Sequence, residues 1–196
     1  MDEASAPSEH PPCSRQVKET RGIGQPRHKK IEIRPAQARH VEDLLVIERQ
    51  CFDVAYYAFH TFDRKDFEFY LDDSDTLFLS AVLDERLVGY VLGPVETWRS
   101  PPAAHIDSIA VLPETQRHGV GGLLIQSFLQ EVRQLGCERA TLEVSPANEA
   151  GLAFFARYGF RKVHRLRNYY GKGLHGVLMA APCGRTKSNE SDGQIR

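Results

Sequence analysis

The chain has 196 residues, of which 41% are hydrophobic and 26% are charged, and its formal net charge is -1 at pH 7. This length and composition are typical of one globular domain with a buried core. Residues 31–183 hold twenty acidic and sixteen basic residues, a balance that argues against a nucleic-acid-binding surface, which would need a clustered basic face.

Neither a membrane segment nor a metal site is indicated. No apolar run approaches the roughly 20 residues that span a bilayer, and the start of the chain is Pro-rich and charged, unlike a secretory signal. We therefore expect a cytoplasmic protein with no membrane association. The four cysteines lack CxxC spacing and the eight histidines lack paired ligand spacing, so we expect reduced thiols and no metal.

Polar composition at both ends predicts disordered tails at 1–29 and 184–196, around one domain at 30–183. Within the domain, hydrophobic periodicity predicts the helices and strands. In chain order they are a strand at 31–35, a helix at 41–52, an aromatic loop at 53–63, a helix at 64–72, a hairpin of strands at 76–83 and 87–95, a strand at 104–111, a helix at 120–135, a strand at 140–145, a helix at 148–158, and strands at 160–167 and 173–180. This order predicts an α/β fold, a mixed sheet with helices on its faces.

A glycine-rich turn at 116–122, Gln-Arg-His-Gly-Val-Gly-Gly, lies between a predicted strand and the longest predicted helix. Glycines let the backbone approach a ligand closely, and a helix start carries partial positive charge, so the turn suits a pyrophosphate. Arg117 can add a charged donor. The Gly-Lys-Ser/Thr of a P-loop is missing, and Leu124 stands where a dinucleotide fingerprint needs its third glycine. Taken alone, the turn could equally be a tight connection whose glycines serve packing.

Longer motifs resemble the GNAT acetyltransferase superfamily. They are Ile-Asp-Ser-Ile-Ala-Val at 106–111, Gln-x-x-Gly-x-Gly at 116–121, Leu-Glu-Val at 142–144, Asn148, and the segment 155–160. Arg-Asn-Tyr-Tyr at 167–170, with Gly173 and Met179, resembles the ribosomal-protein alanine N-acetyltransferases and relatives that acetylate protein N-termini. The likeness runs from about Ile31 to Ala181. It implies a mostly antiparallel sheet that splays where the strands at 104–111 and 140–145 part, with acetyl-coenzyme A between them.

The resemblance also implies which residues touch the cofactor. Backbone groups of the strand at 109–111 would pair with the pantetheine arm, amides at 117–122 would hold the pyrophosphate, and Asn148 would touch the arm. The implied contacts are Ile109, Ala110, Val111, Gln116, Arg117, His118, Gly119, Val120, Gly121, Gly122, Asn148 and Phe155.

Phe155 departs from the family pattern, because relatives commonly place a tyrosine there that protonates the departing sulfur. General acid catalysis contributes about 10²–10⁴-fold, yet a thiol with a pKa of about 8.5 can leave as its anion. The departure therefore puts the mechanism in doubt more than the reaction. Tyr158, Tyr169 and Tyr170 are the nearest substitutes by sequence.

Glu143 is the predicted catalytic base. On a period-2 strand its side chain points away from Leu142 and Val144, although a solvated place at a sheet edge would explain the same pattern. His105 starts the neighbouring strand and either passes a proton through water or is a surface histidine. A backbone amide near 109–111 would stabilise the oxyanion.

The expected acceptor is a primary amine, most directly the N-terminal α-amine of a protein or peptide, whose pKa of about 7.7–8.0 demands a weaker base than lysine at about 10.4. Two rival readings remain, a small-amine acetyltransferase and a non-catalytic acyl-coenzyme A-binding domain. An acidic stretch at 63–75 is either a solvated helix face or an attractor for a cationic acceptor. The candidate acceptor-binding residues, which would otherwise pack between helix and sheet, are Phe52, Tyr57, Tyr169 and Tyr170.

Overall fold

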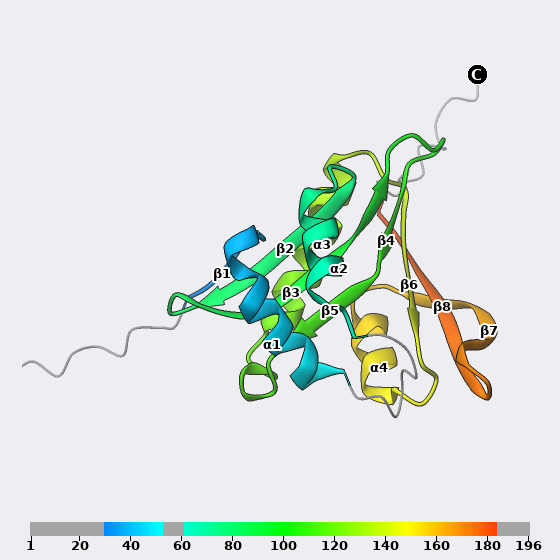
Figure 1. The fold of residues 1–196 in the computed structure, drawn as a ribbon. Coiled ribbons are helices and arrows are strands. Elements are labelled where there is room, and N and C mark those ends of the chain that lie inside the picture. The colour runs from blue at the N-terminus through cyan, green and yellow to red at the C-terminus, as the bar shows by residue number, and fades with distance from the viewer. Residues whose placement is uncertain (1–29, 53–60, 184–196) are drawn as a thin grey trace, which may run out of the picture.

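A computed structural model of the protein describes residues 30–52 and 61–183. The tails expected at 1–29 and 184–196, and most of the aromatic loop with Tyr57, lie outside the described residues. Within the described part, each predicted helix and strand is present, except that the strand at 104–111 is divided in two (Figure 1). The elements are β1 (Ile31–Pro35), α1 (Val41–Cys51), α2 (Arg64–Asp72), β2 (Thr76–Leu83), β3 (Arg86–Glu96), β4 (Ala103–Ile106), β5 (Ser108–Val111), α3 (Val120–Gln134), β6 (Arg139–Val144), α4 (Glu149–Arg157), β7 (Arg161–Gly171) and β8 (Leu174–Pro182), with short 3-10 turns at Ala38–His40 and Pro113–Thr115.

The strands form one mixed sheet in the order β1-β2-β3-β4-β6-β8-β7, with β5 paired to β3. Neighbours are antiparallel except for β4 and β6, which run parallel from the Ala103–Arg139 pair to the Ile106–Leu142 pair. The predicted fold, a mostly antiparallel open sheet flanked by helices, is confirmed.

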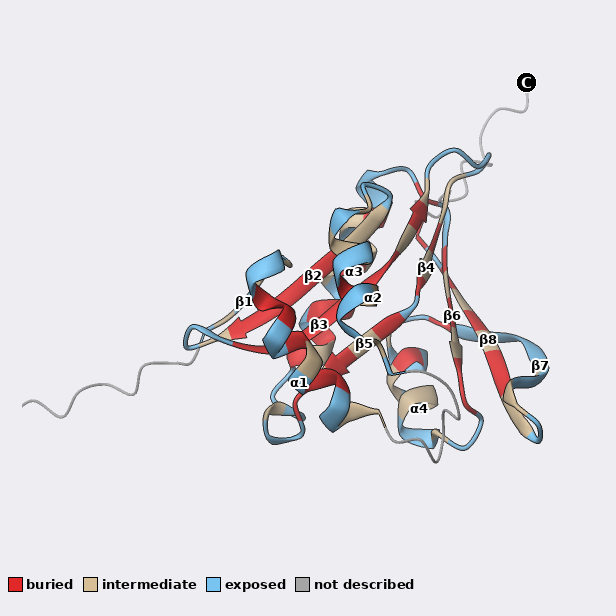
Figure 2. Ribbon diagram, viewed as in Figure 1, coloured by how far each residue is buried: buried red, intermediate tan, exposed pale blue. Residues whose placement is uncertain are grey.

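Helices cover both faces of this sheet, as consecutive residues of β3 show. The Tyr90 ring packs edge-on against Phe67 of α2, with ring centroids 5.6 Å apart. A Cβ atom on Gly89 would instead meet Leu124 of α3. Because neighbouring residues of a strand point to opposite faces, α1 and α2 lie on one face and α3 on the other. The buried residues follow the strands between these layers (Figure 2).

The prediction of one continuous strand at 104–111 is wrong, because the chain breaks into β4 and β5 at Asp107. Along β3, Val95 pairs with Ala104 and Leu92 pairs with Ser108. Three residues of the broken strand therefore face two of β3, which is the geometry of a β-bulge. The backbone amide of Asp107 is held by a 3.0 Å hydrogen bond to the Leu92 carbonyl.

The bulge brings the two backbones close together and starts the splay of the sheet. A Cβ atom at Gly93 would clash with the carbonyl group of His105, so a glycine is needed there. Before the bulge, β4 pairs with both β3 and β6, whereas after it β5 pairs with β3 alone. The family resemblance implies that acetyl-coenzyme A binds in this gap between β5 and β6.

The strand β7 is longer than predicted. It continues to Gly171, so Tyr169 and Tyr170 lie in the strand rather than in a loop before β8. Pairing with β8 is irregular between Leu166 and Gly171, where Asn168 has a left-handed φ of 53°. Among the described residues, no helix combines the length and the apolar character needed to cross a membrane.

Candidate active site

A cleft of about 860 Å³ opens between β5 and β6, a volume within the usual range of roughly 300–1,000 Å³ for ligand pockets. Most of the predicted cofactor residues line it: Ile109, Ala110, Val111, Gln116, Arg117, Gly119, Gly121, Gly122, Asn148 and Phe155. His118 and Val120 are not among the described lining residues. The Val120 side chain is buried in the core, and the exposed His118 ring contacts its own turn through Nδ1 and the Gln116 carbonyl at 2.8 Å. Any contact of Val120 with a ligand would have to come from its backbone.

Residues of the turn at 116–122 line this cleft. Arg117 and Gly119 have left-handed φ angles of 62° and 85°, and Gly119 is the N-cap of α3. The first amides of a helix have no intrahelical acceptor, so they remain available to an anion. A Cβ at Gly121 would meet the Phe154 ring at 3.4 Å, and one at Gly122 would clash with the Tyr158 hydroxyl. The glycines thus let α3 and α4 approach closely beside the cleft.

The start of α4 borders the same cleft. Asn148 caps the helix, because its Oδ1 accepts a 2.8 Å hydrogen bond from the Gly151 amide, and Gly159 follows the helix with a φ of 91°. The sequence prediction of both helix ends is therefore confirmed. Phe155 is 8% exposed and packs edge-on against Phe154 and Phe160. It offers an apolar surface where the family pattern would have a phenol.

His105 and Glu143 meet directly in this part of the sheet. His105 Nε2 lies 2.9 Å from Glu143 Oε2, so the two side chains are in direct contact. His105 Nδ1 lies 2.8 Å from Thr141 Oγ1, its partner in the parallel β4–β6 register. The β4–β6 pairing ends at Leu142, so at Glu143 the strand β6 has β8 on one side and the cleft on the other. The Glu143 side chain is 15% exposed, which argues against a solvated edge carboxylate.

The contact shifts the titration of both groups in opposite directions. Burial disfavours the charged imidazole, but the hydrogen bond and charge of Glu143, with a smaller contribution from Asp107, outweigh burial and raise the pKa of His105. Burial likewise disfavours the carboxylate, but the hydrogen bond and charge of His105 lower the pKa of Glu143. The pair is thus stabilised as an imidazolium and a carboxylate.

A match to a known family accompanies this geometry. The model of the Acetyltransferase (GNAT) family matches residues 41–160, more than half of the chain. The chain belongs to the GNAT acetyltransferase family.

Similar proteins agree with this GNAT assignment. An N-alpha-acetyltransferase of Sulfurisphaera tokodaii is 30% identical over 165 residues, which cover 79% of this chain and 94% of that protein. A ribosomal protein bS18-alanine N-acetyltransferase of Salmonella typhimurium is 29% identical over 53% of this chain and 70% of its own. The crystal structure of the ribosomal-protein-S18-alanine N-acetyltransferase from Escherichia coli has a TM-score of 0.69 at 21% identity, covering 83% of this chain and all of that one. The predicted family, fold and enzyme class are confirmed.

The expected acceptor residues of this GNAT chain are only partly brought together. Phe52 and Tyr170 line the cleft. Tyr169 is not among the described lining residues and is 48% exposed. Its hydroxyl is hydrogen-bonded to Glu143, and burial together with the negative charge of that carboxylate raises the pKa of Tyr169 to about 12. Tyr169 therefore contacts the predicted base, Glu143. Its position in the sequence did not indicate this contact.

Sequence reasoning assigned no role to Tyr70 and Asp107, which extend the polar cluster. Tyr70 Oη donates a 2.6 Å hydrogen bond to Asp107 Oδ2, and Asp107 Oδ1 lies 3.7 Å from His105 Nε2. Burial raises the pKa of the Asp107 carboxyl, against the lowering effects of the Tyr70 hydrogen bond and the His105 charge. An aspartate inside an otherwise apolar strand was the one sequence signal that could have drawn attention to this position.

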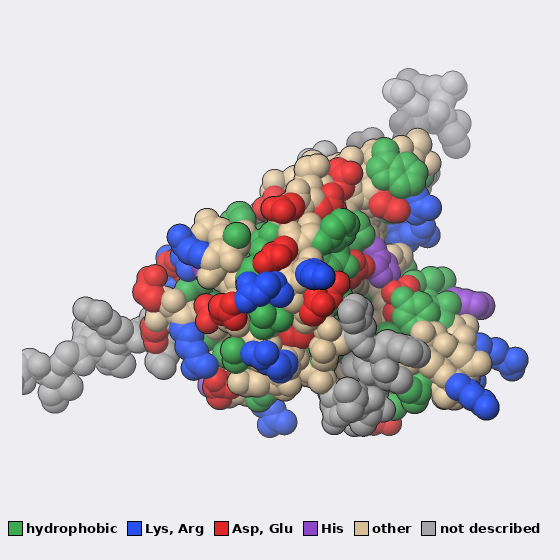
Figure 3. All heavy atoms as spheres, viewed as in Figure 1, with side chains coloured by type: hydrophobic (Ala, Val, Ile, Leu, Met, Phe, Trp, Pro, Cys, Tyr) green, Lys and Arg blue, Asp and Glu red, His purple; other side chains and the backbone are tan. Residues whose placement is uncertain are grey.

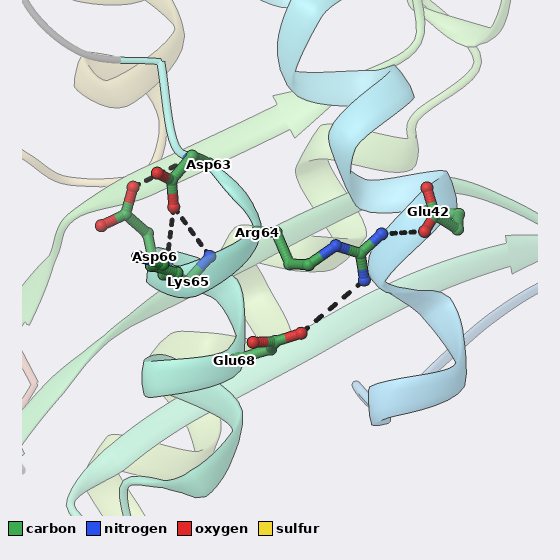
Figure 4. A network of polar contacts seen from close by, with 6 residues as sticks. All are labelled: Glu42, Asp63, Arg64, Lys65, Asp66 and Glu68. Atoms are coloured by element: carbon green, nitrogen blue, oxygen red, sulfur yellow. Dashed lines mark hydrogen bonds and ion pairs between the residues drawn. The ribbon is translucent and has the colours of Figure 1, made fainter.

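Structural roles account for much of the acidic stretch at 63–75. Asp63 caps α2 by accepting from the amides of Lys65 and Asp66, and the Asp66 carboxylate accepts from the Asp63 amide (Figure 4). Arg64 pairs with Glu42 of α1 and with Glu68 of its own helix. Acidic and basic side chains are intermixed over the surface shown in Figure 3. These contacts favour the interpretation of the stretch as a capped, solvated helix face.

Among residues 30–52 and 61–183, no group of three or more His, Cys, Asp or Glu side chains is arranged to hold a metal ion. Cys51, Cys137 and Cys183 are free thiols.

Proposed function

We propose that this protein transfers the acetyl group of acetyl-coenzyme A to the N-terminal α-amine of a protein or peptide. The observation that carries the proposal is the His105–Glu143 pair beside a cleft whose far end is a glycine-rich helix start. Names of relatives support the acceptor class, since several are N-alpha-acetyltransferases. We further propose a cytoplasmic location and a catalytic domain at 30–183.

In this proposal the donor lies in the splay between β5 and β6. Amides at 117–122 and the Arg117 guanidinium bind the pyrophosphate, because a helix N-terminus favours an anion. The β5 backbone at 109–111 pairs with the pantetheine arm, and an amide of this segment stabilises the developing oxyanion. Asn148 contacts the arm from the start of α4. Gly119, Gly121 and Gly122 line the cleft without side chains, so a ligand there can approach the backbone closely.

Glu143 and His105 remove the proton from the attacking amine as a unit. Glu143 lines the cleft and so meets the amine. It passes the proton to a neutral His105, and this transfer leaves the two side chains as the carboxylate and imidazolium that their contact favours. The raised pKa of His105 makes it a stronger proton acceptor than an isolated imidazole. A lysine amine, with a pKa of about 10.4, holds its proton more tightly than an α-amine at about 7.7–8.0, by more than two pKa units. The pair therefore favours α-amines.

Phe155 cannot protonate the leaving sulfur, so the proposal requires the thiol to depart as its anion. A thiol pKa of about 8.5 makes this departure tolerable near neutral pH. Tyr158 also lines the cleft and is the nearest phenol on the same segment.

The deciding experiment is acetylation of a peptide library that contains free α-amines and internal lysines, with mass-spectrometric location of the acetyl group. We expect thiol release that depends on peptide and labels on α-amines. Labels confined to lysine side chains would contradict the acceptor, and turnover only with small amines would favour the metabolite reading. Binding of acetyl-coenzyme A without any turnover would favour a non-catalytic binding domain.

A further inference from the structure

A second carboxylate, that of Asp107, faces the cleft beside the predicted catalytic pair. Asp107 is among the residues that line the cleft, and its side chain is 24% exposed. Its Oδ1 lies 3.7 Å from His105 Nε2, while its Oδ2 accepts the 2.6 Å hydrogen bond from Tyr70. The function proposed above does not use this side chain.

Two separate parts of the fold hold Asp107 in place. Its backbone is the break between β4 and β5, tied to β3 by the 3.0 Å hydrogen bond to Leu92. Its side chain is tied to α2 through Tyr70, whose ring packs against Phe62 with centroids 5.4 Å apart. A carboxylate fixed from both sides loses little conformational freedom when it binds a ligand.

The charges around Asp107 do not cancel. His105 lies within 4 Å of two carboxylates, at 2.9 Å from Glu143 and 3.7 Å from Asp107. Even when the imidazole is protonated, this group of three side chains carries one net negative charge. The basic residues among the described cleft lining, Arg117 and Arg157, belong to the turn before α3 and to the end of α4. The centre of the cleft therefore favours a cation.

We propose that Asp107 binds the acceptor amine in its ammonium form and is a specificity-determining residue of this acetyltransferase. This inference rests on the proposed function. Peptide α-amines are mostly protonated at and below neutral pH, so the acceptor arrives as a cation and is attracted to the carboxylate. The acetylated product is a neutral amide and loses this attraction, which favours its release. Asp107 thus binds the charged substrate more tightly than the neutral product.

The test compares binding of two peptides that differ only in their N-terminus. One is the library peptide with the highest turnover, and the other is the same peptide already acetylated. Their dissociation constants are measured by calorimetry with saturating coenzyme A at about pH 6.5, where the free α-amine is charged. For the natural chain we expect the free amine to bind about tenfold tighter, as for a hydrogen bond between charged groups.

Three variants test whether Asp107 causes this difference in affinity. Asp107→Asn should reduce the ratio of the two dissociation constants to about one, and Tyr70→Phe, which frees the carboxylate from α2, should give an intermediate ratio. Asp72→Asn, an exposed acid at the end of the helix that carries Tyr70, should keep the full ratio. If Asp107→Asn keeps the full ratio of the two dissociation constants, the inference is overturned. A purely structural role of Asp107 would give this result, because it would weaken the binding of both peptides equally.

The two proposals fail in different ways. If the natural chain acetylates no α-amine, the proposed function fails and the inference fails with it. If the natural chain acetylates α-amines while Asp107→Asn still prefers the free amine by the same factor, only the inference about Asp107 fails.

Discussion

The imidazole of His105 and the carboxylate of Glu143 contact each other at 2.9 Å across the parallel strands β4 and β6. The β4–β6 pair is the last pairing before the sheet splays, so the contact lies where the cleft begins. Each group shifts the pKa of the other toward the charged form.

Replacing Glu143 with Gln should lower kcat by about 10²–10⁴-fold, the usual contribution of a general base. Binding of acetyl-coenzyme A, measured by calorimetry, should stay unchanged because the substitution keeps the shape of the side chain. The matched control is Glu149→Gln, an exposed acid in the first turn of α4. Equal kcat values for the two variants would remove Glu143 from the mechanism.

The ion pair predicts a defined pH window for stability. The folded pKa of His105 is raised, so its contribution is complete below the unfolded value of 6.5 and disappears as pH rises through the folded pKa. The folded pKa of Glu143 is lowered, so its contribution is complete above the unfolded value of 4.5 and disappears as pH falls through the folded pKa. The Tm difference between the natural chain and His105→Gln should therefore be largest between these two values. A difference that does not vary with pH would argue against the ion pair.

Gly122 should tolerate alanine only when Tyr158 loses its hydroxyl, because the added Cβ would clash with that oxygen. Gly122→Ala alone should lower the free energy of unfolding by about 1–3 kcal/mol, the typical cost of overpacking. The double variant with Tyr158→Phe should recover much of this loss in urea denaturation. Gly121→Ala is the control, since its Cβ would make an ordinary 3.4 Å contact with Phe154. Similar losses in both single variants would count against the close approach of α3 and α4.

Asn148 is expected to have two separable roles. Asn148→Ala removes the cap that accepts from Gly151, which should cost about 0.5–2 kcal/mol of stability, whereas Asn148→Ser keeps a capping oxygen. If the amide also touches the cofactor, both variants should bind acetyl-coenzyme A more weakly although only the alanine variant is destabilised. Unchanged affinity in the serine variant would limit Asn148 to the structural role.

Much of this molecule could be predicted because its signals are local. The amphipathic helix α3 follows from apolar residues at spacings of three and four, and the cap at Asn148 follows from side-chain chemistry. The family motifs also placed Glu143 and the turn at 116–122, which line one cleft in the structure. The break between β4 and β5 could not be found in this way. Buried residues alternate without interruption through Ala104, Ile106, Ser108 and Ala110, so the pattern is that of one strand.

The sequence by itself determined which segments become helices and strands, that a glycine-rich turn precedes α3, and which carboxylate is the predicted base. Tertiary structure alone decided that His105 touches Glu143, that Tyr169 reaches the same carboxylate, and that Tyr70 fixes Asp107 beside them. The physical reason is that periodicity reports which face of an element a side chain occupies. Which side chains meet depends on strand register and on the bulge at Asp107, and both arise from pairing between distant parts of the chain.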